Sequence, residues 1–441
     1  MKKIGLSLIV STTLLLGATN EELEAQIKHL QAQMQKMQTT QESMVDEIAA
    51  KSYLDGNAYE GFSSMGGAAS KVYYSKDALS IGGYGEYKYT KYMDYKNYSN
   101  ATANDTRNKG EMNIVRFVPY IGFKFNDSIV MNTEIEFEDG GARSDGEKNY
   151  KYAIVEFSYL DFLIDKSFAI RVGHVLTPMG LTNLNHEPVA FLTTDRPLVE
   201  TWIIPSTWHT NGLLVHGEID EFEYYAGLIN SPDAGGFTQG RFIQQGRGGA
   251  KVFSDDYSFV ARLSYEGFDG LTVGASVCAG NTSAAAESSP GAANGVNSQA
   301  KITLMMAEAH AQYKKDGWNI QALAAYGSLA GDVSKLSSDI GEEISSSVNG
   351  QYLTVGYDVM PFFGKSSHAV YAVGEIERLD MDASGDTTYA DNNRFFEYSG
   401  GIAYYPDPKV IIKADYKIRD YAEATKLADE QSFAMQLGFI F

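Results

Sequence analysis

Long apolar runs are nearly missing from this sequence of 441 residues. The clearest one, from Ile4 to Leu16, follows two lysines and ends in small residues, which is typical of a secretory signal peptide, so residues 1–18 are predicted to be cleaved. No later segment has the roughly 18 consecutive apolar residues of a transmembrane helix. Any crossing of a membrane must therefore be made by β-strands.

Cysteine and basic residues are also scarce. The single cysteine, Cys278, excludes an internal disulfide framework. The 36 basic residues against 56 acidic ones give a formal charge of -20, which argues against nucleic acid as a partner. The chain has no nucleophile elbow or P-loop, and Gly83-Tyr84-Gly85 lacks the third glycine of a dinucleotide fingerprint. We therefore expect no enzyme activity and no bound cofactor.

Aromatic residues and glycine are abundant, with 29 tyrosines, 22 phenylalanines and 43 glycines. From Leu79 onward, apolar residues alternate with polar ones, which is the period of a β-strand. Alternation with one apolar face and one charged face is typical of a transmembrane β-barrel, in which lipid and lumen lie on opposite sides of the wall. An early segment shows both faces: Ile81, Tyr87 and Tyr89 on one, and Glu86, Lys88 and Thr90 on the other.

The breaks between these alternating segments fall into two classes. Seven are short turns, and eight are long polar loops, at residues 94–111, 138–149, 176–211, 231–256, 280–300, 329–348, 379–393 and 421–431. Together they join sixteen strands, an even number as in bacterial barrels and enough to leave an aqueous channel. The predicted fold class for residues 78–441 is therefore all-β, a 16-stranded antiparallel transmembrane β-barrel.

The region before the barrel has two parts. Residues 19–50 carry a heptad pattern, which predicts a periplasmic coiled-coil helix that associates protomers and reaches the cell wall. A single amphipathic helix on the protein's own surface is the alternative. Residues 51–77 show no clear period and are predicted to be a linker, lying in or under the barrel. The heptad positions are Leu23, Ile27, Leu30, Met34, Met37, Gln41, Met44 and Ile48.

The third long loop, residues 176–211, differs from the other loops. It holds four of the ten prolines and two of the three tryptophans, and its many apolar residues exclude a solvated tail. Long loops without secondary structure in compact domains are usually functional. We expect this loop to fold against the inner wall of the barrel and to form the pore constriction.

Three segments resemble a known family. They are GGYGEYKY at residues 82–89, the stretch from IRVGHVLTPMG to LLVHGE at residues 170–218, and GFTQGRFIQQGRGGAK at residues 236–251. These segments resemble the phosphate-selective porin O/P-like family of Gram-negative outer membranes, and the heptad helix resembles that of dicarboxylate-type porins. The resemblance covers residues 78–441 and implies a homotrimer of sixteen-stranded channels, each with an inward-folded third loop. The chain departs from phosphate-selective members because it has no dense arginine ladder or lysine cluster.

The charges of the predicted lumen point in two directions. Alternation places more acidic than basic residues on the wall, which favours cations or weak selectivity. Arg196, with Arg241, Arg247 and Lys251 of the next long loop, would instead form an anion-attracting collar at the constriction. In the alternative interpretation these basic residues pair with Glu187, Asp195 and Glu200 and only fix the loop. The wall residues singled out are Arg116, Lys124, Arg171, Arg262, Glu134 and Glu136.

Two groups of residues were weighed as metal sites. His174, His186, Glu187, His209 and His216 match no zinc spacing, so packing and hydrogen bonding explain them better, with His186 placed at the constriction. A segment near residue 380 matches five positions and the glycine of a calcium loop, although strands flank it and a plain acidic surface loop is the alternative. The calcium candidates are Asp380, Asp382, Ser384, Asp386 and Asp391, around Gly385.

These patterns predict a porin of the bacterial outer membrane. It would be surrounded by lipid and would pass small hydrophilic solutes by passive diffusion, with a weak preference for anions such as phosphate or small carboxylates. The preference follows because field lines concentrate at the narrowest cross-section, where a few arginines outweigh a larger acidic population elsewhere. The alternative function is a surface adhesin or envelope scaffold with little transport.

Overall fold

The computed structural model divides the chain into two units, Met1–Ala50 and Lys51–Phe441. In the first unit only Lys28 and Gln31 are described, and both are helical. The predicted signal peptide and the rest of the predicted coiled coil lie outside the described residues. In the second unit the structure describes residues 64–94, 110–141, 143–144, 149–150, 153–247, 256–284, 298–364, 366–388, 394–422 and 430–441. No helix among the described residues has the length and apolar character needed to cross a membrane.

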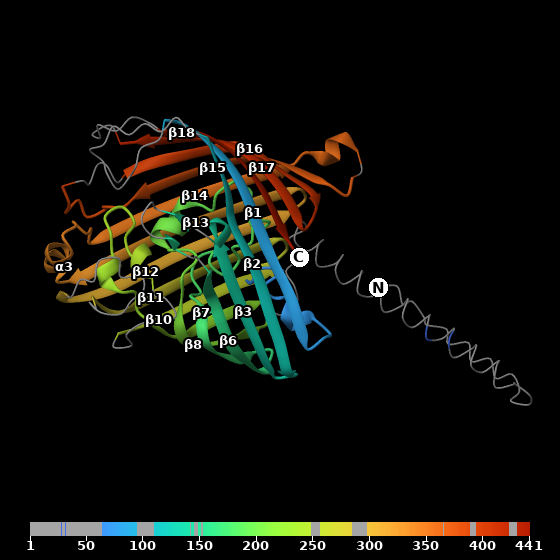
Figure 1. The fold of residues 1–441 in the computed structure, drawn as a ribbon, viewed down its shortest axis with the longest axis horizontal. Coiled ribbons are helices and arrows are strands. Elements are labelled where there is room, and N and C mark those ends of the chain that lie inside the picture. The colour runs from blue at the N-terminus through green and yellow to red at the C-terminus, as the bar shows by residue number, and fades with distance from the viewer. Residues whose placement is uncertain are drawn as a thin grey trace, which may run out of the picture. The chain divides into compact units, whose positions relative to one another are not determined.

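The second unit is a closed antiparallel β-barrel of sixteen strands, in which β1 pairs with β18 and all other barrel neighbours are consecutive along the chain (Figure 1). The predicted strand count and fold class are confirmed. The strands are β1 (Leu79–Asp94), β2 (Gly110–Asn126), β3 (Ile129–Glu138), β6 (Ala153–Asp165), β7 (Phe168–Leu176), β8 (His209–Ile219), β9 (Phe222–Asn230), β10 (Tyr257–Phe268), β11 (Leu271–Ala284), β12 (Ser298–Lys315), β13 (Trp318–Gly331), β14 (Ser347–Asp358), β15 (Ala369–Asp380), β16 (Arg394–Asp407), β17 (Val410–Tyr421) and β18 (Glu430–Ile440).

Short turns join the strands at one end of the barrel, and long loops join them at the other. The turn between β12 and β13 shows why the short ones form. Asp316 and Gly317 both have positive φ, 53° and 82°, as the mirror-image turns of tight hairpins require, and Asp-Gly adopts this conformation readily. Such turn residues made the hairpins recognisable in the sequence.

The remaining elements that the structure describes are short helices and one small hairpin outside the barrel wall. α3 (Val333–Ile340) follows β13 and ends at Gly341, whose left-handed conformation (φ 75°) suits a glycine. α2 (Lys71–Tyr74) precedes β1. The other elements are the small hairpin β4 (Arg143–Ser144) and β5 (Asn149–Tyr150), and short helical turns at Asp139–Gly141, Val199–Ile203, Ala234–Gly236, Gln244–Gly246 and Met360–Phe363.

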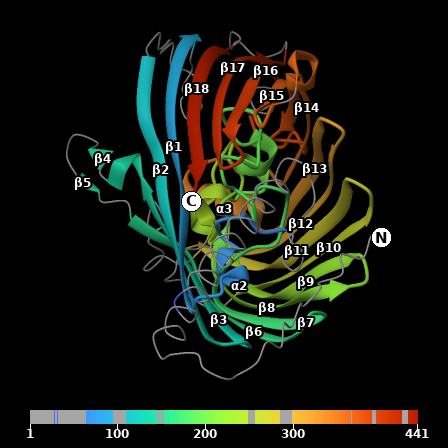
Figure 2. The ribbon, with the colours of Figure 1, turned by 90° about the vertical axis from the view of Figure 1, so that its right-hand side faces the viewer.

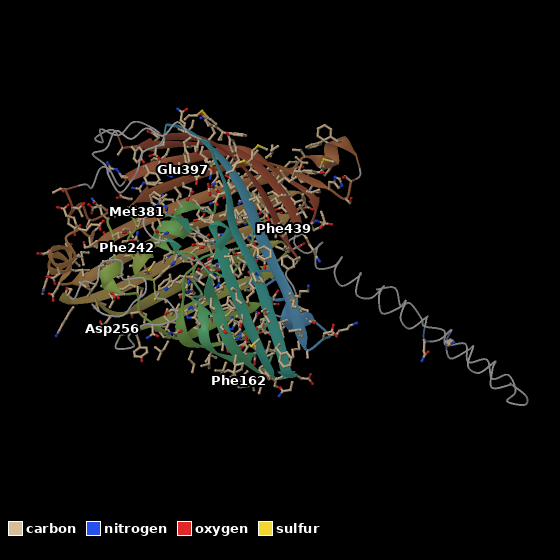
Figure 3. All side chains as sticks on the ribbon, in the orientation of Figure 1. Phe162, Phe242, Asp256, Met381, Glu397 and Phe439 are labelled. Atoms are coloured by element: carbon tan, nitrogen blue, oxygen red, sulfur yellow. The ribbon has the colours of Figure 1, made fainter. Side chains whose placement is uncertain are left out.

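The two faces of the barrel wall differ as the alternation predicts. Outward side chains are apolar and exposed, for example Ile81, Phe162 and Ile402. Inward side chains are polar or charged and mostly buried, for example Glu134 and Lys413. Figure 3 labels Phe162 and Phe439 from the outward set and Glu397 from the inward set. Because inward groups of a barrel with an empty lumen would be wet, their burial means that chain fills much of the interior.

The seam between the first and last strands is held by backbone and aromatic contacts. Gly83 and Phe441 exchange two backbone hydrogen bonds, of 2.9 and 3.1 Å. A Cβ at Gly83 would lie 2.6 Å from the ring of Phe441, and one at Gly85 would lie 2.6 Å from the ring of Phe439. The two glycines therefore let the aromatic side chains of β18 lie flat on β1.

Candidate pore constriction

The third loop, residues 177–208 between β7 and β8, lies inside the ring of strands (Figure 2, green). It is a packed body: Met179 and Trp208 are 0% exposed. Most of the loop is buried, and the residues that are half-buried are Leu181, Asn185, Asp195, Leu198 and Thr201. The apolar residues that excluded a solvated loop in the sequence therefore form part of a core within the lumen.

Asn183 closes the neck of the third loop. Its Nδ2 donates to the carbonyl oxygens of Thr177 (2.6 Å) and Trp208 (3.1 Å), and its Oδ1 accepts the Trp208 amide (2.6 Å). The Thr177 amide also donates to the Trp208 carbonyl, at 2.8 Å. A single buried amide side chain thus joins the first and last residues of the loop.

The third loop crosses the lumen and contacts the wall on several sides. Wall side chains donate to its backbone carbonyls, and wall carboxylates accept its amides and hydroxyls, so both kinds of backbone group find partners. The contacts run from β3 and β6 across to β13–β17. They are His186 with Glu134 (3.1 Å), Gln321 with the Ala190 carbonyl (3.0 Å), Tyr352 with Glu200 (2.6 Å), Glu377 with the Val199 amide (3.0 Å) and Tyr405 with the Val189 carbonyl (2.9 Å).

We call residues 193–195, together with the two lysines Lys88 and Lys417 that pair with Asp195, the wet end of the third loop. The Asp195 carboxylate pairs with Lys88 of β1 (2.5 Å) and Lys417 of β17 (2.8 Å), yet 46% of the Asp195 side chain is exposed. Burial would raise the pKa of Asp195, but attraction from Lys417 and Lys88 outweighs it and lowers the pKa below its usual range. Thr194 is anchored next to it by Asp415, which accepts from the Thr194 amide (2.6 Å) and hydroxyl (2.8 Å). The wet end therefore contains a carboxylate, that of Asp195, which stays charged and is reached by water inside the barrel.

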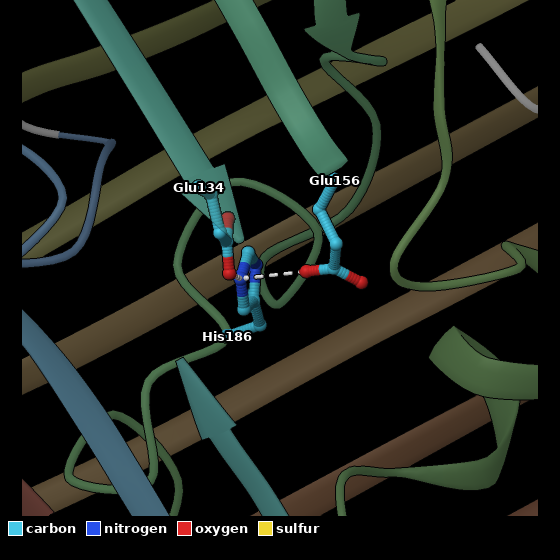
Figure 4. Close-up of side chains that lie close together, drawn as sticks. All are labelled: Glu134, Glu156 and His186. Atoms are coloured by element: carbon cyan, nitrogen blue, oxygen red, sulfur yellow. Dashed lines mark hydrogen bonds and ion pairs between the residues drawn. The ribbon is translucent and has the colours of Figure 1, made fainter. Parts of the chain in front are cut away.

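We call residues 186–187 and 206–208, together with Glu134 and Glu156 of the wall, the sealed end. His186 Nε2 lies 3.1 Å from Glu134 Oε1 and 3.6 Å from Glu156 Oε2 (Figure 4). The three side chains are at most 2% exposed. Thr207 donates its hydroxyl to Glu156. Water is excluded here, in contrast to the wet end.

The arginines of the predicted collar hold the third loop through backbone and ring contacts. Arg196, 8% exposed, donates to the His186 carbonyl (3.1 Å). Arg247 donates to the Pro205 carbonyl (3.2 Å). Arg241 lies over the Trp202 ring, 4.1 Å from its centroid. Lys251 lies outside the described residues. Of the acidic partners in the alternative interpretation, Asp195 bonds to Lys88 and Lys417, and Glu200 accepts from Thr182 and Tyr352.

Residues 64–78, here called the inner segment, also enter the barrel. The amides of Ala68 and Ala69 both donate to Glu187 Oε1, at 2.9 Å each. Glu187 is 1% exposed, so this residue of the predicted constriction joins the third loop to the inner segment. The sequence interpretation assigned this region to a linker in or under the barrel; its first part, residues 51–63, lies outside the described residues. Other anchors are Ser64 with Glu223 (2.9 Å), Tyr73 with Asp161 (2.7 Å) and Lys124 with the Ser75 carbonyl (2.6 Å).

The predicted wall residues all face inward, and each binds a specific partner. Arg116 is shared by Glu86 and Glu136, at 3.3 Å each. Arg171 pairs with Asp161 at 2.8 Å and stacks on Tyr159, and Arg262 bonds to the Gly180 carbonyl and to His310. Of the other histidines weighed as ligands, His216 bonds to Asp161 (2.8 Å), and His174 bonds to His209 (2.8 Å). These contacts are ion pairs and hydrogen bonds of inward-facing side chains.

The predicted calcium loop has hydrogen-bond donors at its carboxylates. Asp382 accepts from Ser345 (2.9 Å), Gly385 (3.1 Å) and Thr387 (3.1 Å), and Asp386 accepts from Ser384 (2.7 Å). Asp380 accepts from Arg378 at 3.3 Å, and Asp391 lies outside the described residues. These oxygens accept hydrogen bonds from separate donors, and calcium binding by the loop stays a prediction.

The comparisons with known proteins identify both a fold and a relative. No protein-family model matches the chain. Three solved structures have a similar fold at 11–12% identity: an anion-selective porin from Comamonas acidovorans (TM-score 0.52, covering 82% of this chain and 99% of that one), the outer-membrane channel DcaP of Acinetobacter baumannii (0.52, 82% and 97%) and OmpF of Salmonella typhi (0.50, 82% and 97%).

An uncharacterized protein of Aquifex aeolicus (strain VF5) is 30% identical to the chain over an alignment of 383 residues that covers 83% of this chain and 81% of the other. The structural likeness establishes the fold, and the sequence identity over most of both chains establishes the kinship. The chain thus belongs to the same family as the Aquifex protein and has the sixteen-stranded fold of the porin barrels.

Proposed function

We propose that the protein is a porin of the bacterial outer membrane, a passive channel for small hydrophilic solutes. The observation that carries the proposal is Asp195, a half-exposed carboxylate between Lys88 and Lys417 inside a barrel whose outer face is apolar. A charged group that water reaches within an otherwise packed lumen marks the path open to ions. The apolar outer face is the surface that lipid requires.

Selectivity at this point depends on a few opposed charges. The wet end presents two lysines to one exposed aspartate, while the Asp415 carboxylate is turned to Thr194. Rings of charge at the narrowest point set which ions a pore favours. We propose a weak preference for small anions, such as phosphate or carboxylates, with the lysines of the wet end as the groups that attract them in place of the arginine collar.

Single-channel recording in planar bilayers tests the proposal. The wild-type protein should pass steady current, and its reversal potential in a potassium chloride gradient should indicate a weak anion preference. Lys88→Gln with Lys417→Gln should shift the reversal potential towards cations. Lys166→Gln is the matched control, because Lys166 lies in an exposed turn between β6 and β7 and pairs with Glu218. Clear cation selectivity in the wild type would overturn the anion preference.

The second candidate function is an envelope scaffold or adhesin. The observation that favours it is the packing of the lumen by the third loop and the inner segment. A scaffold would pass no steady current in the same recording, so one measurement separates the two functions. Membership of the phosphate-selective porin O/P-like family, assembly as a homotrimer and contact with the cell wall through residues 19–50 are further parts of the proposal.

A further inference from the structure

Three metal-ligating side chains converge at the sealed end of the third loop. Glu134 comes from β3, Glu156 from the neighbouring β6, and His186 from the third loop (Figure 4). One ligand atom of each lies within 4.8 Å of the others, and all three side chains are buried. The set combines one imidazole with two carboxylates from three separate segments, so no spacing along the sequence reveals it.

The hydrogen bonds of His186 decide which ring nitrogen has a free lone pair. Nδ1 lies 3.1 Å from the Asn183 carbonyl oxygen, which can only accept, so Nδ1 carries the hydrogen. In the neutral imidazole, Nε2 then has a free lone pair and faces two carboxylate oxygens. Three electron-rich atoms this close repel one another unless a proton or a metal ion lies between them.

At this point one oxygen of each carboxylate has no hydrogen-bond donor in the part of the chain that the structure describes. Among the described residues, Glu134 Oε2 and Glu156 Oε2 are buried and have no hydrogen-bond donor. The nearby arginines make ion pairs and hydrogen bonds to other groups: Arg116 binds Glu86 and Glu136, Arg196 donates to the His186 carbonyl, and Arg247 donates to the Pro205 carbonyl. Burying carboxylates without compensation costs several kcal/mol, so a cation would stabilise the cluster.

We propose that Glu134, Glu156 and His186 bind one divalent transition-metal ion, with zinc the best match. A neutral imidazole and two carboxylates suit zinc, which is usually four-coordinate, and a second imidazole nitrogen that donates to a carbonyl is typical of metal-bound histidine. Ligands about 2.0–2.1 Å from a tetrahedral ion lie roughly 3.3–3.5 Å apart. The distances of 3.1 and 3.6 Å from Nε2 to the two carboxylates bracket that value. The Thr207 hydroxyl, on Glu156, orients one ligand.

The ion would join the third loop to two strands of the wall. Glu134 and Glu156 belong to the barrel, whereas His186 lies near the neck closed by Asn183. This inference stands apart from the proposed transport, since a scaffold barrel would bind the same ion. Metal binding and ion conduction are therefore tested by different measurements.

The experiment uses the full chain, purified in detergent and stripped with a chelator. After incubation with ZnCl2 and desalting, wild-type protein should retain one zinc per chain by mass spectrometry. Cobalt in place of zinc should give the visible absorption of a low-coordinate site. X-ray absorption of the zinc form should show oxygen and imidazole neighbours and no sulfur. Wild-type protein that retains no zinc and binds no cobalt would overturn the proposal.

Variants locate the ion. His186→Gln, Glu134→Gln and Glu156→Gln should each weaken zinc binding by at least about tenfold. His216→Gln, which changes a buried histidine bound to Asp161, is the matched control and should bind as the wild type does. Equal zinc retention in His186→Gln would refute the site. If a variant fails to form the barrel by circular dichroism, the absorption spectra of the wild type still decide, because sulfur or purely oxygen ligands would also contradict the assignment.

Discussion

The two ends of the third loop use the same kinds of side chain under opposite conditions. At the wet end, Asp195 pairs with Lys88 and Lys417 while 46% exposed. At the sealed end, Glu134 and Glu156 are 0% and 1% exposed beside His186. Water screens the first set, so its pairs contribute little to stability and remain available to passing ions. Without water, uncompensated charge in the second set is costly, so its partners determine how firmly the loop is held.

The largest effect is expected from opening the neck that both ends share. Asn183→Ala removes three hydrogen bonds and leaves the buried Trp208 amide unpaired, while the two carbonyl oxygens keep the amides of Thr177 and Met179 as donors. We expect the free energy of unfolding to fall on the order of 3 kcal/mol, and the conductance to rise as the loop loosens. Denaturant titration in lipid vesicles and bilayer recording measure the two effects.

Thr201→Ala provides the control for the neck variant. Thr201 is half-buried, and its hydroxyl makes one long bond, 3.3 Å, to the Leu198 carbonyl. Its stability should stay within about 0.5 kcal/mol of the wild type. Equal losses in the two variants would show that Asn183 is no special fastening of the loop.

The next effect separates the two ends by charge. Asp195→Asn leaves Lys88 and Lys417 without their shared carboxylate in the water path. An interaction of about 1 kcal/mol between charges in water corresponds to roughly a fivefold change, so the anion-to-cation permeability ratio should rise by that order. Glu134→Gln, at the sealed end, should leave the ratio unchanged. Matching shifts in the two variants would mean that ions pass both ends.

Acid sharpens the comparison further. Lys417 and Lys88 overcome the effect of burial and lower the pKa of Asp195, so its charge should persist at pH 4, where an ordinary aspartate with a pKa of about 3.9 is half protonated. The difference in reversal potential between wild type and Asp195→Asn should therefore be as large at pH 4 as at pH 7. Loss of half of that difference would indicate an ordinary carboxyl group.

The smallest effect concerns a buried lysine between the two ends. Lys413 is 1% exposed, its Nζ has no hydrogen-bond partner among the described residues, and it lies 3.5 Å from the centroid of the Phe191 ring. Lys413→Met should be neutral or stabilise the barrel by roughly 1 kcal/mol, since a buried unpaired charge is replaced by an apolar chain of similar length. Lys417→Met, four residues along, removes one lysine partner of Asp195 and should lower the stability by less than about 1 kcal/mol. The midpoint of thermal unfolding in detergent distinguishes them.

Local patterns carried most of the barrel. Alternation and turn chemistry act over a few residues, so Asp316-Gly317 predicts a hairpin and the wall faces can be assigned by parity. The apolar residues of the third loop likewise required a buried place. Each of these predictions depends on neighbours in sequence, and the number of strands follows from them.

The partners within the lumen could not be predicted in this way. Asp195 meets Lys417, and Thr194 meets Asp415, across more than two hundred residues, and only closure of the wall brings them together. Zinc spacing along the sequence does not reveal the cluster at His186 for the same reason, because its neighbours Glu134 and Glu156 come from two strands. The contacts of residues 64–78 could not be predicted from their side chains, since small residues such as Ala68 and Ala69 make them through backbone amides.

The seam at Gly83 and Phe441 implies an order of assembly. The wall is complete only when the first strand meets the last, yet the third loop and inner segment already touch strands around most of the circumference. Filling a closed barrel from one end would require the third loop and the inner segment to form their many wall contacts in a confined lumen, so we expect the contents to be in place while the sheet is still open. We expect the two hydrogen bonds between Gly83 and Phe441 to form last, because a misplaced third loop or inner segment would keep β1 and β18 apart.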